Sequence, residues 1–266
     1  MRPPILPSAP SGVHGAFVAL GVAAAVAVFL VEAHRRRRLD DRLYMILAGS
    51  LFCGAVAAKL STSWRYLAEA PDPTLLGALV YGGKSVLGGL AGAYFGAHLT
   101  KRLIGYRAPT GDVFAPAVAL GIGLGRFGCL LTEPPGTPTG LPWGVTVGAA
   151  RAAEIPGFPP DWVGVPLHPS FVYEILFQFA MLAVLLRLCR RPELQGELFK
   201  VYLLAYAVFR FLVEFVRGNQ VVWAGLTRSQ LFLIPSALLL AGYFLRRAGR
   251  PLPAPPPPPP RPLEAS

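Results

Sequence analysis

Apolar residues recur in long runs along this chain, and short polar or basic segments separate the runs. A helix rises about 1.5 Å per residue, so a run of 17 to 25 residues or so reaches across the apolar core of a bilayer. The runs of about this length are 13–31, 43–60, 75–100, 113–132, 170–189, 198–216 and 229–245. The pattern therefore predicts an all-α integral membrane protein with about seven transmembrane helices.

Three segments fall outside these helices. Residues 1–12 are rich in proline and form an outer N-terminal segment before the seven-helix domain, which we place at 13–248. The tail 249–266 contains six consecutive prolines, and we expect it to be disordered. The longest connection, 133–169, holds Trp143 and Trp162, whose rings suit the headgroup region of a membrane. Long connections are often functional, although a purely structural cap is the alternative.

The distribution of basic residues predicts the orientation. Basic clusters follow the first, third, fifth and seventh runs, namely Arg35–Arg38 with Arg42, then Lys101, Arg102 and Arg107, then Arg187, Arg190 and Arg191, and finally Arg246, Arg247 and Arg250. The other side keeps only the scattered residues Arg2, Arg65, Arg151, Arg217 and Arg228. Because basic loops stay in the cytoplasm, we expect the N-terminus outside and the C-terminus in the cytoplasm.

Composition supports this class. Hydrophobic residues make up 53% of the 266 residues, charged residues 15%, and the mean hydropathy is +0.49. The net charge of +11 would suggest nucleic acid in a soluble chain, but here the basic residues act as topology signals, and no nucleic-acid partner is expected. The cysteines Cys53, Cys129 and Cys189 lie far apart without ligand or redox spacing, so we expect no metal site and no cofactor.

Two arginines lie within the apolar runs. Arg126 and Arg210 are each six residues from the outer end of their run, which places both about 9 Å deep. Insertion scales put the free-energy cost of placing an arginine at the centre of a membrane helix near 3 kcal/mol. A common site at one depth would justify this cost, whereas the alternative is two unrelated arginines that snorkel to the interface.

The sixth run favours a common site. Tyr202, Tyr206, Arg210 and Glu214 recur every four residues, and Arg217 follows three residues later. Residues at this spacing share one helical face. A polar face in a membrane helix must line a cavity or contact protein, so we interpret it as the wall of a pocket in the outer leaflet.

Two further runs add polar residues at the same level. The third run contains Lys84 and Ser85 within GGKSVLGGLAG, on the same predicted face as Tyr81, and the fifth run begins within LHPSFVYE. That motif places His168 at the outer boundary and Tyr173 and Glu174 just inside; His168 as a plain interface residue is the alternative. Cations beside an apolar cavity suit an anionic phospholipid, with its phosphate on the arginines.

At these residues the chain resembles the bacterial prolipoprotein diacylglyceryl transferase family. The matching stretches, in the family's order, are GGKSVLGGLAG, GLGRFGCLLTEPPGTPTGLPWGV, LHPSFVYE, YAVFRFLVEFVRG and GLTRSQL. The resemblance implies a multi-pass protein of the bacterial inner membrane with its active site toward the outer leaflet. It implies transfer of the diacylglyceryl group of phosphatidylglycerol to the lipobox cysteine of a prolipoprotein, with glycerol phosphate leaving.

The resemblance also implies roles for individual residues. Arg126 and Arg210 match the family's two essential arginines, Glu214 its following carboxylate and Tyr206 its preceding tyrosine. We add His168 as the group that assists deprotonation of the acceptor thiol. The remaining candidates for substrate binding are Lys84, Ser85, Gly125, Gly128, Tyr173, Glu174 and Arg217.

Several positions depart from the family pattern. Cys129 stands where the family usually has asparagine, Leu87 where many members have histidine, and His14, on a loose alignment, where the family has tyrosine. The family usually has an acidic residue in the loop beyond, where this chain has Glu133-Pro134-Pro135. The departures leave the phosphate-binding part intact and bear on the base and on the acceptor. The alternative function is therefore a phospholipid-binding membrane homologue that is non-catalytic, transports lipid or uses another acceptor.

Overall fold

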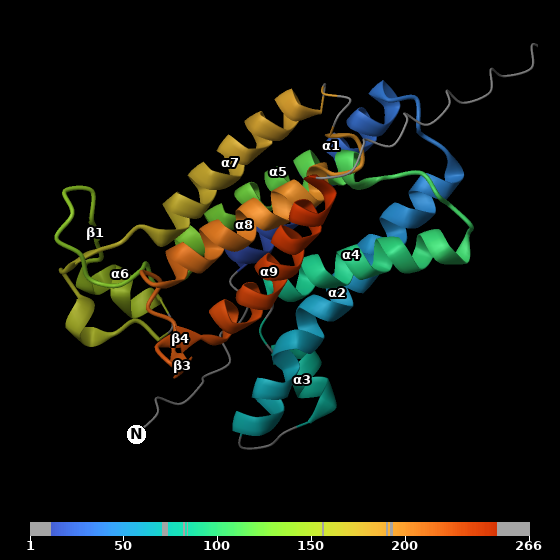
Figure 1. Ribbon diagram of the computed structural model, residues 1–266. Helices are drawn as coiled ribbons and strands as arrows, with labels where there is room; N and C mark the ends of the chain where they lie inside the picture. Colours follow the sequence, from blue (N-terminus) through green and yellow to red (C-terminus); the bar gives the residue numbers. More distant parts are fainter. Residues whose placement is uncertain are drawn as a thin grey trace, which may run out of the picture.

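The structure is a computed structural model that describes residues 12–70, 74–81, 83, 85–155, 157–189, 191 and 194–248. Helices dominate it (Figure 1). Apart from Gly12, the predicted N-terminal segment lies outside the described residues, as does the predicted tail 249–266.

Nine α-helices are present among the described residues: α1 Gly12–Arg35, α2 Asp41–Glu69, α3 Leu75–Tyr81, α4 Val86–Leu103, α5 Gly111–Thr132, α6 Ala149–Glu154, α7 Ser170–Leu188, α8 Leu198–Glu214 and α9 Arg228–Ala248. Two antiparallel pairs accompany them, β1 Val145–Thr146 with β2 Pro166–Leu167 and β3 Val221–Trp223 with β4 Leu226–Thr227. A 3₁₀ helix, η1, covers Pro160–Trp162.

Five of the described helices are long and apolar enough to cross a membrane, namely α1, α2, α5, α7 and α9. This confirms a mostly helical chain with several candidate membrane spans. The other two expected runs correspond to α4, with 18 residues, and α8, with 17 residues. The count of seven crossings stays a prediction.

One predicted helix is wrong. The run 75–100 does not form a continuous helix, because α3 ends at Tyr81 and α4 begins at Val86. Ser85 has an extended backbone, and its hydroxyl accepts a hydrogen bond from the backbone N–H of Gly88 at 3.1 Å. A serine in this position caps the start of a helix and so favours a new helix at the next residue. Lys84 lies outside the described residues.

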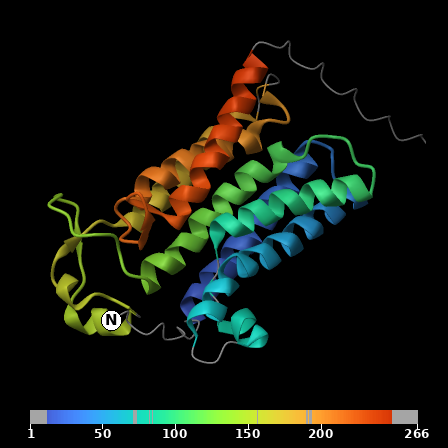
Figure 2. The same cartoon turned by 60° about the horizontal axis from the view of Figure 1, so that its bottom comes forward.

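Helix α5 is the central element. It packs against α1 on one side and against α7 and α8 on the other, and Figure 2 shows it between these groups. Small residues permit the close approach of α1. A Cβ atom on Gly21 of α1 would lie 2.5 Å from the carbonyl oxygen of Gly121 on α5, so a larger residue would separate the two helices.

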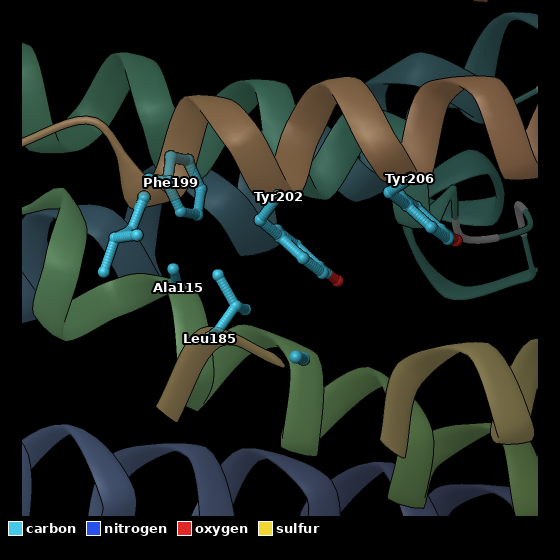
Figure 3. Packing of buried hydrophobic residues seen from close by; sticks show 7 residues of the cluster. Ala115, Leu185, Phe199, Tyr202 and Tyr206 are labelled. Carbon is cyan, nitrogen blue, oxygen red and sulfur yellow. The ribbon is translucent and has the colours of Figure 1, made fainter. Parts of the chain in front are cut away.

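The polar face of α8 points into the protein. Figure 3 shows Phe199, Tyr202 and Tyr206 of α8 facing Ala115 of α5 and Leu185 of α7. The two tyrosine rings are parallel, with centroids 6.0 Å apart, and both side chains are buried. The predicted polar face therefore contacts protein and not lipid tails.

The basic segments meet at one end of the bundle. Arg36, after α1, lies 3.7 Å from the carboxylate of Asp112 at the start of α5. Asp112 also accepts a hydrogen bond of 2.7 Å from the backbone N–H of Gly196, just before α8. Glu197 forms an ion pair with Arg247 near the end of α9. The ends of α1 and α9 and the starts of α5 and α8 are thus joined.

The small elements lie at the opposite end of the bundle. The connection 133–169 contains β1, α6, η1 and β2, and the β3–β4 hairpin lies near it (Figure 1). Val147, Ala152, Ile155 and Leu167 form a small apolar cluster of their own within the connection. This segment is thus a folded cap over one end of the bundle.

Candidate functional site

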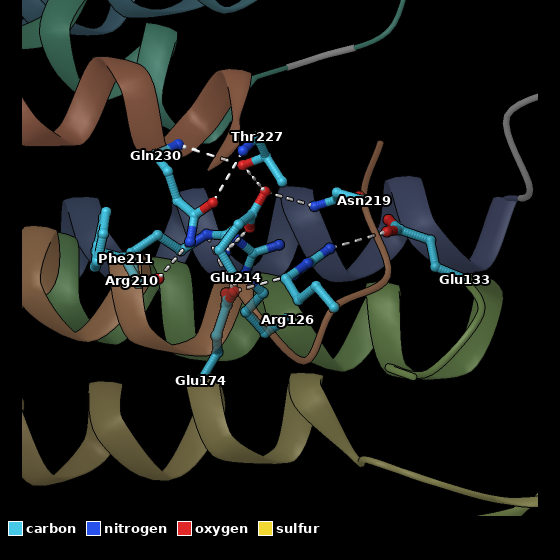
Figure 4. Close-up of polar contacts among 10 residues, drawn as sticks. Arg126, Glu133, Glu174, Arg210, Phe211, Glu214, Asn219, Thr227 and Gln230 are labelled. Atoms are coloured by element: carbon cyan, nitrogen blue, oxygen red, sulfur yellow. Dashed lines mark hydrogen bonds and ion pairs between the residues drawn. The ribbon is translucent and has the colours of Figure 1, made fainter. Parts of the chain in front are cut away.

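Three arginines surround one carboxylate inside this capped end (Figure 4). Glu174 of α7 is fully buried and forms an ion pair with Nε of Arg126 on α5. Its Oε1 atom lies 3.4 Å from Nε of Arg210 on α8 and 3.0 Å from Nη1 of Arg217, which follows α8. The sequence predicted that Arg126 and Arg210 share a site, and the structure brings them together through Glu174.

A second carboxylate fixes Arg210. Glu214 forms an ion pair with Arg210 one turn earlier on α8. Its Oε1 atom accepts hydrogen bonds of 2.8 Å from Nδ2 of Asn219 and from the hydroxyl of Thr227 on β4. The backbone N–H of Thr227 in turn donates to Oε1 of Gln230 at 2.9 Å. Glu214 is thereby held in one orientation by α8, the β3–β4 hairpin and α9.

The charges in this arginine site do not balance. The three guanidiniums face two buried carboxylates, Glu174 and Glu214, whereas the third carboxylate nearby, Glu133, is partly exposed and lies 3.9 Å from Nη2 of Arg217. The buried groups alone therefore carry one excess positive charge. Burial lowers the pKa of Arg217, which follows the end of α8, and repulsion from Arg210 lowers it further. A buried excess charge is unfavourable until an anion accompanies it. The arginine site is therefore suited to bind a monoanion.

Polar atoms beside these arginines also lack partners. The hydroxyl of Tyr206 is buried next to Arg126 and interacts with it electrostatically, but no described residue lies in hydrogen-bond geometry to it. Nε of Arg126 and Oε2 of Glu174 face each other as charges, but their geometry does not give a hydrogen bond. An unpaired buried polar group costs roughly 1–3 kcal/mol. The hydroxyl of Tyr206 is therefore available to donate to an oxygen of a ligand.

A polar cavity opens next to the arginine site. It measures about 170 Å³, and its lining includes Glu133, Trp162, Arg217 and Asn219. Nη2 of Arg217 lies 3.9 Å from Oε2 of Glu133, and its guanidinium lies 4.6 Å from the ring centroid of Phe171. Arg217 thus separates the buried ion pairs from a cavity lined by the cap.

The structure places His168 outside the contacts of the arginine site. Its Nδ1 atom lies 3.3 Å from the hydroxyl of Tyr173, which also accepts a hydrogen bond of 2.9 Å from Nε1 of Trp143. Neighbouring residues of a helix do not share a face, so Tyr173 points away from the direction of Glu174. His168 and Tyr173 therefore form a separate polar group beneath Trp143.

The other predicted site residues have structural contacts of their own. Ser85 caps α4, as described above, and Lys84 lies outside the described residues. A Cβ atom on Gly125 would meet nothing within 4 Å, whereas one on Gly128 would lie 3.3 Å from Cα of His14. Gly128 therefore serves the packing of α1 on α5.

Some residues of the site were missed from the sequence. The motif GLTRSQL contains Thr227 and Gln230, but nothing in it shows that both belong to the network of Glu214. The sequence contains no indication of a role for Asn219 other than its position two residues after Arg217. Glu174 was expected to bind substrate, and no sequence pattern indicated that its contacts link three arginines.

Comparison with known proteins gives one consistent result. The family model described as prolipoprotein diacylglyceryl transferase matches residues 6–246. A phosphatidylglycerol–prolipoprotein diacylglyceryl transferase of Chromohalobacter salexigens is 34% identical over 209 residues, covering 75% of this chain and 73% of the relative. Those of Bordetella bronchiseptica and Finegoldia magna are 32% and 28% identical, covering 81% and 88% of this chain and 80% and 89% of theirs. No solved structure matches the chain.

Proposed function

The chain belongs to the prolipoprotein diacylglyceryl transferase family, and from this membership we infer that it transfers the diacylglyceryl group of phosphatidylglycerol to the lipobox cysteine of prolipoproteins. The observation that carries the inference to this chain's own residues is the arginine site, Arg126, Arg210 and Arg217 around Glu174, in which the guanidiniums outnumber the buried carboxylates by one. Phosphatidylglycerol carries one negative charge on its phosphate. The ligand therefore completes the charge balance of the site.

The reaction increases negative charge at the phosphate. The acceptor sulfur attacks the glyceryl carbon, a C–S bond forms, and the C–O bond to the phosphate breaks. Glycerol phosphate leaves with the electron pair and becomes a dianion, while the thiol loses its proton. Donors already oriented on the phosphate, such as the guanidiniums of Arg126 and Arg210, stabilise the charge that develops there.

We assign the residues as follows. Arg126 and Arg210 bind the phosphate, and Glu174 and Glu214 hold their side chains in place. The unpartnered hydroxyl of Tyr206 donates to a phosphate oxygen. The remaining predicted contacts to lipid or acceptor are those of Lys84, Ser85, Gly125, Gly128, Tyr173 and Arg217. The sequence also predicted His168 as the group that takes the thiol proton, and this role stays a prediction.

We also propose the full topology. The chain crosses the bacterial inner membrane seven times, with α4 and α8 in addition to the five longer spans and with the N-terminus outside. The 18 residues of α4 extend about 27 Å, close to the thickness of a bilayer core. The meeting of the basic segments at one end supports a cytoplasmic location for that end. The arginine site then faces the outer leaflet.

The direct test uses the purified full-length chain in micelles with labelled phosphatidylglycerol and a lipobox peptide. The proposal expects a thioether-linked diacylglyceryl peptide and one glycerol phosphate per peptide modified. A peptide with serine in place of the cysteine and the Arg210→Ala protein are the controls. If the protein binds the lipid but forms no product, the proposed activity is wrong and the chain is a non-catalytic lipid-binding homologue. Complementation of a strain depleted of its own transferase gives the same test in cells.

A further inference from the structure

Three metal-ligand side chains meet beside the arginine site. They are His14 near the start of α1, Cys129 in the last turn of α5, and Glu133, the residue that follows α5. One ligand atom from each lies within 4.8 Å of the other two. The Nδ1 atom of His14 is 3.8 Å from Oε1 of Glu133.

The helix packing creates this cluster. Cys129 and Glu133 are four residues apart, and the backbone N–H of Glu133 donates to the carbonyl of Cys129 at 2.8 Å, so both side chains lie on one face at the end of α5. Gly128 lets α1 approach this face, because a Cβ atom there would lie 3.2 Å from the carbonyl oxygen of His14 and 3.1 Å from Cβ of Phe17. The approach of α1 brings a ring nitrogen of His14 within 4.8 Å of the sulfur of Cys129.

The donor set is typical of zinc. Imidazole, thiolate and carboxylate bind Zn²⁺ at about 2.0–2.3 Å, which places neighbouring ligand atoms of a tetrahedral site roughly 3.3–3.8 Å apart. The observed cluster needs only small side-chain movements to reach this geometry. Zinc sites with three protein ligands keep a fourth position for water or substrate, and such sites are catalytic rather than structural.

Two arginines and a threonine also face the cluster. Nη1 of Arg126 donates to Sγ of Cys129 at 3.6 Å, and Nη2 of Arg217 lies 3.9 Å from Oε2 of Glu133. The hydroxyl of Thr132 is 3.4 Å from Nδ1 of His14 and donates to the carbonyl of Gly128 at 2.8 Å. A thiolate and a carboxylate neutralise a divalent ion, so the two arginines face a neutral centre.

We propose that His14, Cys129 and Glu133 form a binding site for a Zn²⁺-class ion whose open fourth position takes the sulfur of the acceptor cysteine. The role of the acceptor rests on the proposed function, whereas binding of the ion does not. Coordination to a metal deprotonates a thiol at neutral pH and keeps the sulfur nucleophilic. The thiol proton is released to water. Its positive charge balances the second negative charge that the phosphate gains when glycerol phosphate leaves.

The position of the cluster fits this role. Sγ of Cys129 is 3.6 Å from a guanidinium nitrogen of Arg126, which we place on the phosphate. A sulfur in the fourth position would therefore lie near the carbon to which that phosphate is attached. Cys53 on α2 is 76 residues from Cys129 in the sequence and does not belong to the cluster, so it is the control for a distant thiol.

Metal binding is tested first and without any assay of activity. The purified full-length chain is treated with a chelator, dialysed and titrated with Co²⁺. One equivalent should give visible bands of tetrahedral cobalt and a near-ultraviolet thiolate-to-cobalt band, and Zn²⁺ should displace both. Cys129→Ser should abolish the thiolate band, and His14→Gln, at a partly exposed position, should weaken binding. Cys53→Ser should keep the whole spectrum.

The outcomes separate the two proposals. If the chelated protein gives no thiolate-to-cobalt band, or if the band survives in Cys129→Ser, the metal site is overturned. If cobalt binds as expected, chelation should lower transfer to a lipobox peptide by roughly 10²-fold, at the low end of what proton removal contributes to catalysis, and Zn²⁺ should restore it. Unchanged transfer after chelation overturns the role in thiol activation. Absence of transfer by the zinc-loaded protein counts against the proposed function instead.

Discussion

The guanidinium of Arg126 on α5 and the carboxylate of Glu174 on α7 form a buried ion pair, and Glu174 joins Arg126 to the arginines of α8. Taking such charges out of water is unfavourable, and removal of one partner from a buried pair costs about 3–5 kcal/mol. Glu174 is therefore needed both to keep the arginines buried and to set the distance between them. Because Glu174 has both roles, the effect of its replacement on function can be separated from the effect on stability only by comparison with a second buried carboxylate outside the site.

Replacement of Glu174 by glutamine should abolish transfer and lower the thermal unfolding temperature. The amide keeps the shape but leaves Glu214 as the only buried carboxylate beside the three guanidiniums, with the partly exposed Glu133 at 3.9 Å from Arg217. Glu197 is the matched control, because it is also buried and pairs with Lys200 and Arg247, but at the other end of the bundle. Glu197→Gln should lower the unfolding temperature and keep transfer. Equal loss of transfer in both variants would show that the loss results from lower stability and not from a role of Glu174 in the site.

Lysine should not replace either central arginine. Arg126→Lys and Arg210→Lys keep the positive charge but lose the planar fork that binds two phosphate oxygens, so transfer should fall close to the level of the alanine variants. Arg36→Lys makes the same change beside Asp112 at the opposite end and should leave transfer unchanged. Rates are measured with labelled phosphatidylglycerol and a lipobox peptide. Normal rates in Arg126→Lys or Arg210→Lys would mean that charge alone is required there.

The two stacked tyrosines of α8 should respond in opposite ways. The hydroxyl of Tyr202 donates to Oε1 of Gln178 at 2.8 Å, so Tyr202→Phe leaves a buried acceptor unpaired and should destabilise the protein by roughly 1–3 kcal/mol. Tyr206→Phe removes a hydroxyl that has no described partner and should not lower stability. It should instead reduce transfer, because we assign this hydroxyl to the phosphate. Denaturation and transfer assays of both variants check the pair, and unchanged transfer in Tyr206→Phe would remove the assignment.

The sequence predicted those parts of the molecule that depend on local periodicity. The spacing from Tyr202 to Glu214 identified the buried face of α8, and the similar positions of Arg126 and Arg210 in their runs indicated the common site in which both contact Glu174. Helical geometry alone relates such residues, so no knowledge of the fold was required. The break after Tyr81 was missed, because hydropathy continues through it while the cap of α4 depends on one serine side chain.

The contacts between distant segments could not be predicted in the same way. Glu174 was seen as one polar residue of a helix start, and nothing in the sequence indicated that it would meet three arginines. The cluster of His14, Cys129 and Glu133 requires the packing of α1 on α5, which small residues such as Gly128 permit but do not specify. Sequence spacing therefore excluded a metal site that tertiary packing makes geometrically feasible.

Two glycines one turn apart test the packing of α1. Gly128→Ala would place a Cβ atom 3.1–3.3 Å from His14 and Phe17, so α1 must shift and the unfolding temperature should fall. A Cβ atom on Gly125 meets nothing within 4 Å, and alanine there should raise stability by about 0.5–1 kcal/mol through lower backbone entropy in the unfolded chain. The two variants are compared by thermal unfolding in the same detergent. Equal unfolding temperatures would show that α1 is not held at Gly128.

The two imidazoles at the capped end, His14 and His168, give the sharpest test of how the acceptor thiol is activated. His168 contacts Tyr173, whereas His14 lies with Cys129 and Glu133 beside Arg126. If the ion held by His14 generates the thiolate, His168→Gln should leave the pH profile of transfer unchanged, and His14→Gln should lower the rate at neutral pH. A general base contributes roughly 10²–10⁴-fold, so the two assignments differ by far more than assay error. A loss of that size in His168→Gln, with normal transfer in His14→Gln, would restore the base predicted from the sequence. Because glutamine retains hydrogen bonding in both variants, such a difference would report proton removal or metal binding and not the loss of a contact.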